Sequence, residues 1–254
     1  MDKLVFNPAA TIREQGLVRQ RLVHELVNTA TVGFKRDFEL ALRSVKVDGG
    51  GFDTRHQAQG ISSDRVLMTP GPLMVTGRNL DIAMEKEAVM VVSATNGELA
   101  FTRRGDLRIA TDGTTLVTGS GHIVQGRDGP VRVPPGFRIR ISPDGTVFGA
   151  DPAQPGAEPN QEVDRIALRD ASRTPLSRRV DGLFKVAGQP PGTDIVNGPE
   201  PPMLTPQALE GSNMNPVAAM TRLIDHARSF EAQIRVVKEM KDIDVSGASM
   251  MKPV

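Results

Sequence analysis

The sequence predicts an α+β protein, mainly β, with a helix at each end of the chain and a β-rich domain between them. Both end segments carry apolar residues at helical spacing, with few Gly or Pro residues among them. Between the ends, turn pairs that contain Gly separate short segments in which apolar and polar residues alternate. We expect the terminal helices to pair as a coiled coil and extended linkers to join them to the β-rich domain.

The N-terminal helix is predicted over residues 8–29. Val18, Leu22 and Leu26 are four residues apart, which places them on one side of a helix. Polar residues occupy much of the remaining surface, so this helix is too polar to be stable alone. Gly33 provides the C-terminal stop, because glycine adopts the left-handed conformation that ends many helices.

Residues 76–150 carry the pattern of antiparallel strands joined by tight turns. Residues 88–92 form a continuous apolar run, which predicts a central strand. Over residues 137–141, apolar residues alternate with two arginines, so one face is apolar and the other charged. Turn pairs that favour hairpins occur at Asn96-Gly97, Asp112-Gly113, Asp128-Gly129 and Asp144-Gly145.

The C-terminal helix has the clearest pattern. Asn215 is a good N-cap, Pro216 suits the first helical position, and the helix is expected to reach Lys241. At 1.5 Å per residue this helix is about 39 Å long. Apolar residues at spacings of 3 and 4 form a heptad seam, which needs a second helix: Met220, Leu223, Ala227, Phe230, Ile234 and Val237.

These elements divide the chain into three predicted parts. Residues 1–35 and 207–254 form a terminal helical domain. Residues 36–75 and 187–206 form a region of extended linkers and a β-hairpin, since Gly and Pro interrupt both segments. Residues 76–186 form the β-rich middle domain.

Composition excludes several classes of function. The formal net charge is +1, so no global field attracts nucleic acid or an anionic membrane. The chain has no Cys, which excludes thiol catalysis and thiolate metal sites. The four His residues lack metal-binding spacing, and the glycines at 49–51 lack the Lys-Ser or Lys-Thr of a phosphate loop. We predict no enzyme activity, no catalytic, cofactor-binding or metal site, and no small-molecule substrate.

Two motifs resemble those of the flagellar basal-body rod and hook family. Residues 24–35, HELVNTATVGFK, are similar to the family's N-terminal motif NNLANxxTxGFK, although His24 and Glu25 replace its first two Asn residues. Residues 209–217, LEGSNMNPV, followed by Met220 and by the IxxxRxFEA pattern at residues 224–232, are similar to its C-terminal motif.

The middle of the chain also resembles this family in the order of its segments. Residues 101–107 are similar to the central hairpin of the family's middle domain, which would place Gly105 in a turn. Residues 36–39 and 84–91, together with the chain length, are most similar to the proximal rod members. The resemblance therefore covers nearly the whole chain.

The resemblance implies a structural subunit that assembles helically into the periplasmic drive shaft of the basal body and transmits torque. The implied partners are other copies of the chain, other proximal and distal rod proteins, the membrane-ring protein and the surrounding ring proteins. It also implies export by the flagellar type III system without a cleaved signal peptide. The N-terminus agrees, since it lacks the long apolar region of a secretory signal.

Two alternatives remain open at this point. The chain could be a distal rod or hook subunit of the same family, or a secreted β-domain enzyme or ligand-binding module with helical arms. The second alternative predicts a pocket with convergent polar groups in residues 76–186. For the rod subunit, the predicted interface residues are Leu22, Leu26, Asn28, Gly33, Phe34, Asn213, Asn215, Pro216, Met220, Leu223, Ala227, Phe230, Ile234 and Val237.

Overall fold

A computed structural model describes residues 3–38, 41–46, 56–61, 65–151, 153, 159–196, 198 and 201–250. The chain divides into two units, each assembled from segments that are far apart in the sequence. One unit comprises residues 1–27, 39–63 and 215–254, and the other comprises residues 28–38 and 64–214. The predicted class is confirmed: the protein is α+β and mainly β, with two helices.

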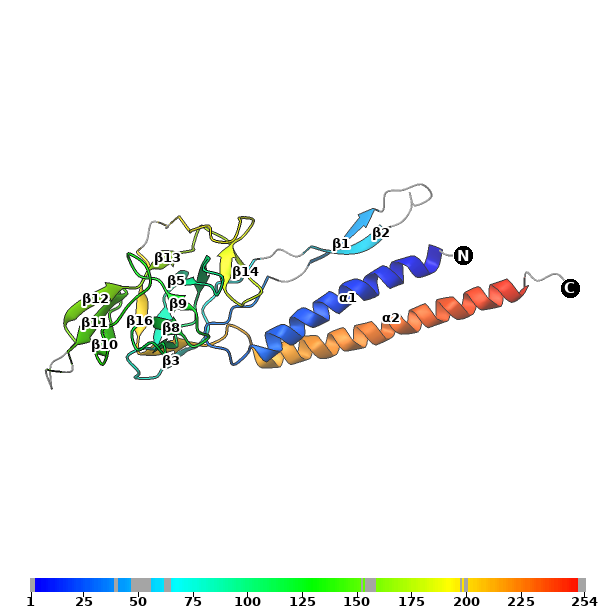
Figure 1. Ribbon diagram of the computed structural model, residues 1–254. Helices are drawn as coiled ribbons and strands as arrows, with labels where there is room; N and C mark the ends of the chain where they lie inside the picture. Colours follow the sequence, from blue (N-terminus) through cyan, green and yellow to red (C-terminus); the bar gives the residue numbers. More distant parts are fainter. Residues whose placement is uncertain are drawn as a thin grey trace. The chain divides into compact units, whose positions relative to one another are not determined.

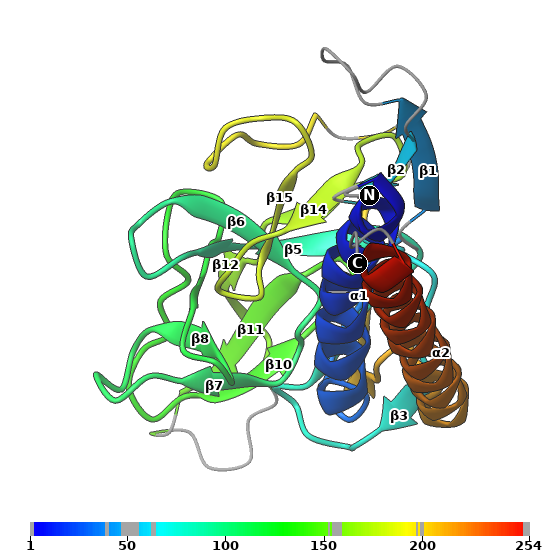
Figure 2. The same cartoon turned by 90° about the vertical axis from the view of Figure 1, so that its right-hand side faces the viewer.

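The first unit contains both helices and one β-hairpin. Helices α1 (Lys3–Val27) and α2 (Pro216–Met250) contact each other and run antiparallel, side by side (Figures 1 and 2). Strands β1 (Ala41–Lys46) and β2 (His56–Ile61) pair antiparallel, and β2 contacts α1. Among the described residues, neither helix is long and apolar enough to cross a membrane.

The start of α2 is capped as the sequence predicts. The Asn215 side-chain Oδ1 accepts hydrogen bonds from the backbone N–H groups of Val217 and Ala218, at 3.0 and 3.2 Å. These are two of the four N–H groups that a helix leaves without partners at its first turn. The cap therefore fixes the residue at which α2 begins.

The surface of α2 carries two rows of side chains that differ in exposure. One row is half-buried, lies at spacings of 3 and 4 residues, and includes His226, whose Nε2 lies 3.0 Å from the Gln15 carbonyl of α1. This row therefore faces α1, and its members are Leu223, His226, Phe230, Gln233, Val237 and Met240. The neighbouring row remains exposed and consists of Met220, Ile224, Ala227 and Ile234.

The second unit contains the remaining strands, which form one large sheet and three small ones. The large sheet has the order β14-β15-β6-β5-β9-β8-β7, and β13 also pairs with β5. Its strands are β5 (Ala88–Ser93), β6 (Leu99–Thr102), β7 (Leu107–Ile109), β8 (Leu116–Thr118), β9 (Ile123–Val124), β13 (Leu168–Asp170), β14 (Leu176–Arg178) and β15 (Phe184–Val186).

The small sheets are all antiparallel. Strands β10 (Arg138–Ile141), β11 (Thr146–Ala150) and β12 (Gln161–Arg165) form a three-stranded sheet, where the predicted alternation of residues 137–141 is confirmed. Strand β16 (Leu204–Pro206) pairs with β4 (Ile82–Met84), and β17 (Ala208–Glu210) pairs with β3 (Leu73–Val75).

Strand β5 lies at the centre of this unit, as its continuous apolar run predicts. Met90 and Val92 belong to one buried apolar cluster, while Val89 and Val91 belong to a second one. Successive side chains of a strand point to opposite faces, so β5 is covered on both faces. That double burial is the reason why the strand has no polar alternation.

The predicted hairpin at residues 101–107 is wrong. Strand β6 pairs with β5 and β15, whereas β7 pairs with β8, so the chain crosses over between them. Gly105 is needed here for a close approach, because a Cβ atom at this position would lie 1.7 Å from the Ile82 carbonyl oxygen. Gly105 is therefore buried in this crossing, while its neighbours Arg104 and Asp106 are half-buried.

The observed units have different boundaries from the three predicted parts. Residues 28–35 and 207–214, which the sequence analysis assigned to the helical domain, lie in the β-rich unit. Residues 39–63 lie in the unit that contains the helices. The physical reason is that residues 28–38 and 207–214 form hydrogen bonds and ion pairs with one another and with the strands of the β-rich unit.

Candidate functional site

The two family-like motifs come together in the β-rich unit. The Gly33 N–H donates to the Glu210 carbonyl at 2.7 Å, and the Asn213 N–H donates to the Phe34 carbonyl at 3.2 Å. The segment that follows α1 in the chain is thus bonded to the segment that precedes α2. We call Gly33, Lys35, Arg103, Glu210 and Asn213 the clasp.

A buried ion cluster lies at the centre of the clasp. Glu210 Oε1 lies 2.6 Å from Lys35 Nζ, and Glu210 Oε2 lies 2.6 Å from Arg103 Nε. The side chains of all three residues are at least 96 % buried, since their exposed fractions are 0, 1 and 4 % for Lys35, Arg103 and Glu210. Removing charges from water is costly, so such groups persist only when they are paired and hydrogen-bonded.

Backbone carbonyls satisfy the remaining donors of Arg103. Its Nη1 donates to the carbonyls of Lys86 and Ala88, and its Nη2 donates to the Met84 carbonyl at 2.6 Å. The backbone of Lys86 has a φ of +47°, which non-glycine residues rarely adopt. This turn between β4 and β5 aims three carbonyls at one guanidinium, whose rigid fork of donors matches them.

The cluster holds two cations and one carboxylate, and burial together with this excess of positive charge lowers the pKa of Lys35. Lys35 Nζ also donates to the Thr69 carbonyl at 2.8 Å. Burial, and then the positive charge of Arg103, lower the pKa of Lys35 from 10.5 to about 8, although the contact with Glu210 opposes that change. A lowered lysine pKa means that burying the charged form costs stability below pH 8, and that this cost is relieved as the pH rises toward 10.5.

Gly33 is required by the packing of the clasp. Its φ is +68°, and a Cβ atom here would lie 2.3 Å from the Arg103 carbonyl oxygen. Both the backbone conformation and the space exclude other residues. The glycine therefore lets the segment that follows α1 lie directly against the chain at Arg103.

Asn213 joins three chain segments. Its Oδ1 accepts from the Arg36 N–H at 2.7 Å, and its Nδ2 donates to the carbonyls of Leu67 and Thr69 at 2.9 and 3.2 Å. An amide side chain can both donate and accept, which lets one residue satisfy backbone groups on both sides. The Asn213 side chain thus links the backbone at Arg36 to the backbone at Leu67 and Thr69 through hydrogen bonds.

Phe34, next to Lys35 in the chain, packs against Arg178. Its ring is buried, and the guanidinium carbon of Arg178 lies 4.4 Å from the ring centroid. Arg178 also donates to the Lys35 carbonyl and pairs with Asp37 at 3.2 Å. The cation–π contact and these polar contacts attach residues 34–37 to strand β14.

The structure brings together only some of the predicted interface residues. Gly33 and Asn213 are in the clasp, and Phe34 lies between Gly33 and Lys35 in the chain. Asn28 accepts a hydrogen bond from the Thr31 hydroxyl at 3.1 Å, and Asn215 caps α2 beside an exposed Pro216. The others lie on the helices: Leu22, Leu26, Leu223, Phe230 and Val237 are half-buried, and Met220, Ala227 and Ile234 are exposed.

Sequence reasoning missed Lys35, Arg103 and Glu210 as site residues. Lys35 and Glu210 lie inside the two motifs, but a charged residue beside a turn is more often solvated than buried. The available signal was that Lys35 and Glu210 have opposite charges and each lies next to an apolar or glycine residue of its motif. Arg103 carried no such signal, because its role depends on strands that pair far along the chain.

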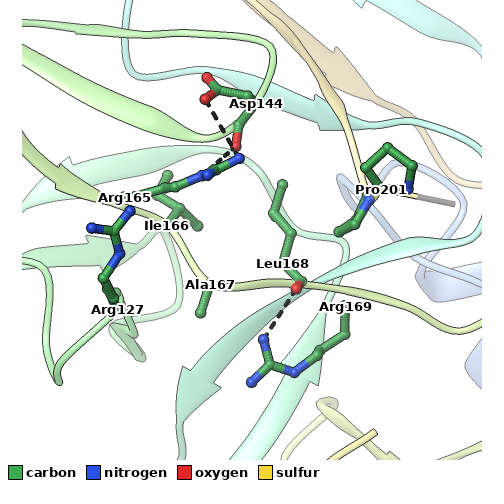
Figure 3. Close-up of a pocket in the computed structure, with 10 residues that line it drawn as sticks. Arg127, Asp144, Arg165, Ile166, Ala167, Leu168, Arg169 and Pro201 are labelled. Atoms are coloured by element: carbon green, nitrogen blue, oxygen red, sulfur yellow. Dashed lines mark hydrogen bonds and ion pairs between the residues drawn. The ribbon is translucent and has the colours of Figure 1, made fainter. Parts of the chain in front are cut away.

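A pocket of about 310 Å³ lies elsewhere in the β-rich unit. Its lining bears on the alternative that the chain is an enzyme or a ligand-binding module. Figure 3 shows Arg165 beside Asp144 and Arg169 near the Leu168 carbonyl. Arg165 pairs with Asp144 at 3.5 Å, and Arg169 pairs with Asp194 at 2.8 Å. The lining contains no Ser, Cys, His or Lys, and across the described parts of the chain no acidic and His residues group as metal ligands do. The charged groups of the lining are Arg127, Asp144, Arg165 and Arg169.

Two protein-family models match parts of the chain. A model described as "Flagellar basal body rod FlgEFG protein C-terminal" matches residues 205–250, and one described as "Flagellar hook protein FlgE/F/G D1 domain" matches residues 83–149. The first match contains Glu210 and Asn213, and the second contains Arg103.

Curated relatives cover most of the chain. The flagellar basal-body rod protein FlgF of Salmonella typhimurium is 36% identical over 222 residues, and that of Escherichia coli K12 is 35% identical over 222 residues, each match covering 85% of both chains. The rod protein FlgG of Caulobacter vibrioides is 27% identical over 247 residues, covering 92% of this chain and 87% of its own. The chain therefore belongs to the flagellar basal-body rod protein family.

Proposed function

We propose that this chain is a structural subunit of the proximal part of the flagellar rod, which assembles helically and transmits torque. The observation that carries this proposal is the exposed apolar row on α2. Met220 and Ile224 are each 53% exposed, and Ile234 is 37% exposed. Together with Ala227 they follow helical spacing, so they form a stripe on one side of the helix, interrupted by the exposed Glu231 between Ala227 and Ile234.

The stripe favours packing against a further helix. Leu223, Phe230 and Val237 lie between the stripe and the polar side chains that face α1, so α2 has apolar side chains over more of its surface than one partner helix covers. A helix with a wide apolar face is typical of bundles with several partners. We infer that the stripe packs in coiled-coil fashion against terminal helices of neighbouring subunits.

The clasp suits the transmission of torque. A shaft must resist twisting between its inner helices and its outer domains. The clasp bonds the two chain segments that lead to the helices to each other and to Arg103, through buried contacts. Buried ion pairs of this kind impose a defined geometry even where they add little stability.

Family membership supports the remaining parts of this proposal. We place the chain in the periplasmic rod, exported without a cleaved signal peptide, with other copies and other rod proteins as neighbours. We also propose that the chain contacts the membrane-ring protein and the surrounding ring proteins. In this proposal its role is structural and not catalytic. The proximal rod is favoured over the distal rod or hook because the FlgF proteins of Salmonella typhimurium and Escherichia coli are 36 and 35% identical to the chain, against 27% for the FlgG protein.

A matched pair of double variants tests the stripe. The variant Ile224→Asp with Ile234→Asp adds two charges on the stripe, and the variant Val236→Asp with Ile243→Asp adds them at exposed apolar positions off it. We expect both proteins to fold. In a strain that lacks the native gene, only the second should restore swimming and appear in purified basal bodies. Normal swimming and incorporation of the stripe variant would refute the interface.

A further inference from the structure

Strand β3 has an open edge in the β-rich unit. The Gly211 N–H donates to the Pro72 carbonyl at 2.8 Å, and the Thr76 N–H donates to the Gln207 carbonyl at 2.9 Å. Since hydrogen-bonded positions alternate along an antiparallel ladder, Met74 faces β17 and the backbone groups of Leu73 and Val75 point away from it. Among the described strands, β17 is the sole partner of β3.

The side chains of this edge strand are all apolar and all exposed. Leu73, Met74 and Val75 are 55, 45 and 83% exposed. An exposed apolar edge is a template for pairing with another chain, and proteins usually protect such edges with charges. Strand β10 shows that protection, since it also ends a sheet and carries the exposed residues Arg138 and Arg140. Strand β3 has no comparable charge.

The edge is held rigidly at both ends. Before it, the Gly71 N–H donates to Glu210 Oε1 at 3.0 Å, which ties the strand to the clasp. After it, the Thr76 hydroxyl donates to Asp81 Oδ2 at 2.7 Å, and Arg78 pairs with the same carboxylate. A strand that is already fixed loses little conformational entropy when another segment pairs with it.

We propose that β3 is a docking edge for an extended backbone segment of a neighbouring rod-family subunit. A short strand with three apolar side chains buries far less than the roughly 1,200 Å² of a stable interface between free proteins. Such an edge binds well only where other contacts already hold the partner at high effective concentration. A polymer of like subunits meets that condition, and a soluble partner does not.

This inference rests on the proposed function, and a site-specific photo-cross-linker tests the two separately. The probe, benzoylphenylalanine, replaces Val75 in the full-length chain, and the control carries it at Val180, a fully exposed apolar residue of a turn. Both proteins are expressed in motile cells, irradiated, and recovered in purified basal bodies. Recovery of the Val180 control in basal bodies establishes the rod location, whatever the result at Val75.

We expect the Val75 probe to form a cross-link to another rod-family subunit, mapped by mass spectrometry to an extended segment, at least several-fold above the control. A cross-link to a ring protein, or none above the control level in incorporated protein, would overturn the proposal. As a second readout, Val75→Lys should reduce swimming while leaving thermal unfolding unchanged, because that side chain is already exposed. Val180→Lys should leave both unchanged, and normal swimming of Val75→Lys would also overturn the proposal.

Discussion

Single residues in the clasp show how a charge imbalance is tolerated inside a small β-rich unit. Glu210 is the only carboxylate that contacts both Lys35 and Arg103 in the described structure, and it also accepts from the Gly71 N–H. Arg103 has three further carbonyl acceptors, whereas Lys35 has one, the Thr69 carbonyl. The three charged groups therefore differ in how many buried groups would lose a partner if one of them were removed.

Glu210→Gln should be far more destabilising than Lys35→Met. Losing the carboxylate leaves two buried cations without a counter-charge, which costs about 3–5 kcal/mol of the free energy of unfolding. Losing the ammonium leaves Arg103 and Glu210 as a balanced pair, so the cost should be much smaller. Denaturant unfolding followed by circular dichroism measures both, and equal losses would show that Glu210 does not balance the cluster.

Gly33→Ala should destabilise the protein more than Gly97→Ala. Both glycines have a positive φ, +68° and +83°, so both substitutions carry backbone strain of about 1 kcal/mol or more. Only Gly33 adds a steric clash, with the Arg103 carbonyl, while the space at Gly97 is open. The difference between the two losses of unfolding free energy measures the cost of the steric clash. A larger loss for Gly97→Ala would contradict this account.

At the scale of whole elements, the helix pair combines apolar and polar contacts. The row of α2 that faces α1 includes His226 and Gln233, one heptad apart, among the apolar residues. The side-chain oxygens of Gln15 and Gln233 are buried and have no hydrogen-bond partner among the described residues. An unsatisfied buried polar atom costs about 1–3 kcal/mol, which leaves this helix pair weaker than an apolar seam would be.

Gln233→Leu should therefore raise the melting temperature of the helices. Leucine removes the unsatisfied oxygen and adds apolar area to the row that faces α1. Gln20→Leu on the exposed surface of α1 is the control, and it should change the melting temperature little. Thermal melts at 222 nm report both changes. If Gln233→Leu lowers the melting temperature, the orientation of α2 against α1 is different from the one described here.

On the scale of the whole molecule, the β-rich unit is closed by segments from both ends of its sequence. Strands β3, β16 and β17 lie outside residues 76–186, yet β16 pairs with β4 and β17 supplies Glu210 to Arg103. The unit therefore depends on residues 28–38 and 204–214 as much as on its central sheet. A contiguous middle domain, as the sequence analysis outlined it, would lack these parts.

A fragment of residues 28–214 should fold, and a fragment of residues 76–186 should not. The shorter fragment exposes the edge of β4 and leaves Arg103 buried without its carboxylate, which is a severe cost for a small unit. Thermal unfolding by circular dichroism should be cooperative for the longer fragment only. Cooperative unfolding of the shorter fragment at a similar temperature would show that the clasp is dispensable for folding.

The sequence was sufficient for features that depend on local patterns. Apolar spacing identified both helices, Asn215 and Pro216 marked the start of α2, and the continuous run of residues 88–92 identified the central strand. Local chemistry fixes these features, because caps, turn residues and side-chain periodicity act over a few residues. The two motifs identified the family for the same reason.

Only the tertiary structure decided what depends on distant partners. The crossing at Gly105, the charge cluster of Lys35, Arg103 and Glu210, and the division of α2 into a covered and an exposed row were not readable from spacing alone. Each depends on which strand or helix lies opposite, at sequence separations of up to 211 residues. The sequence by itself thus determined the elements and the family, while long-range packing determined which charges are buried and which apolar surfaces remain open.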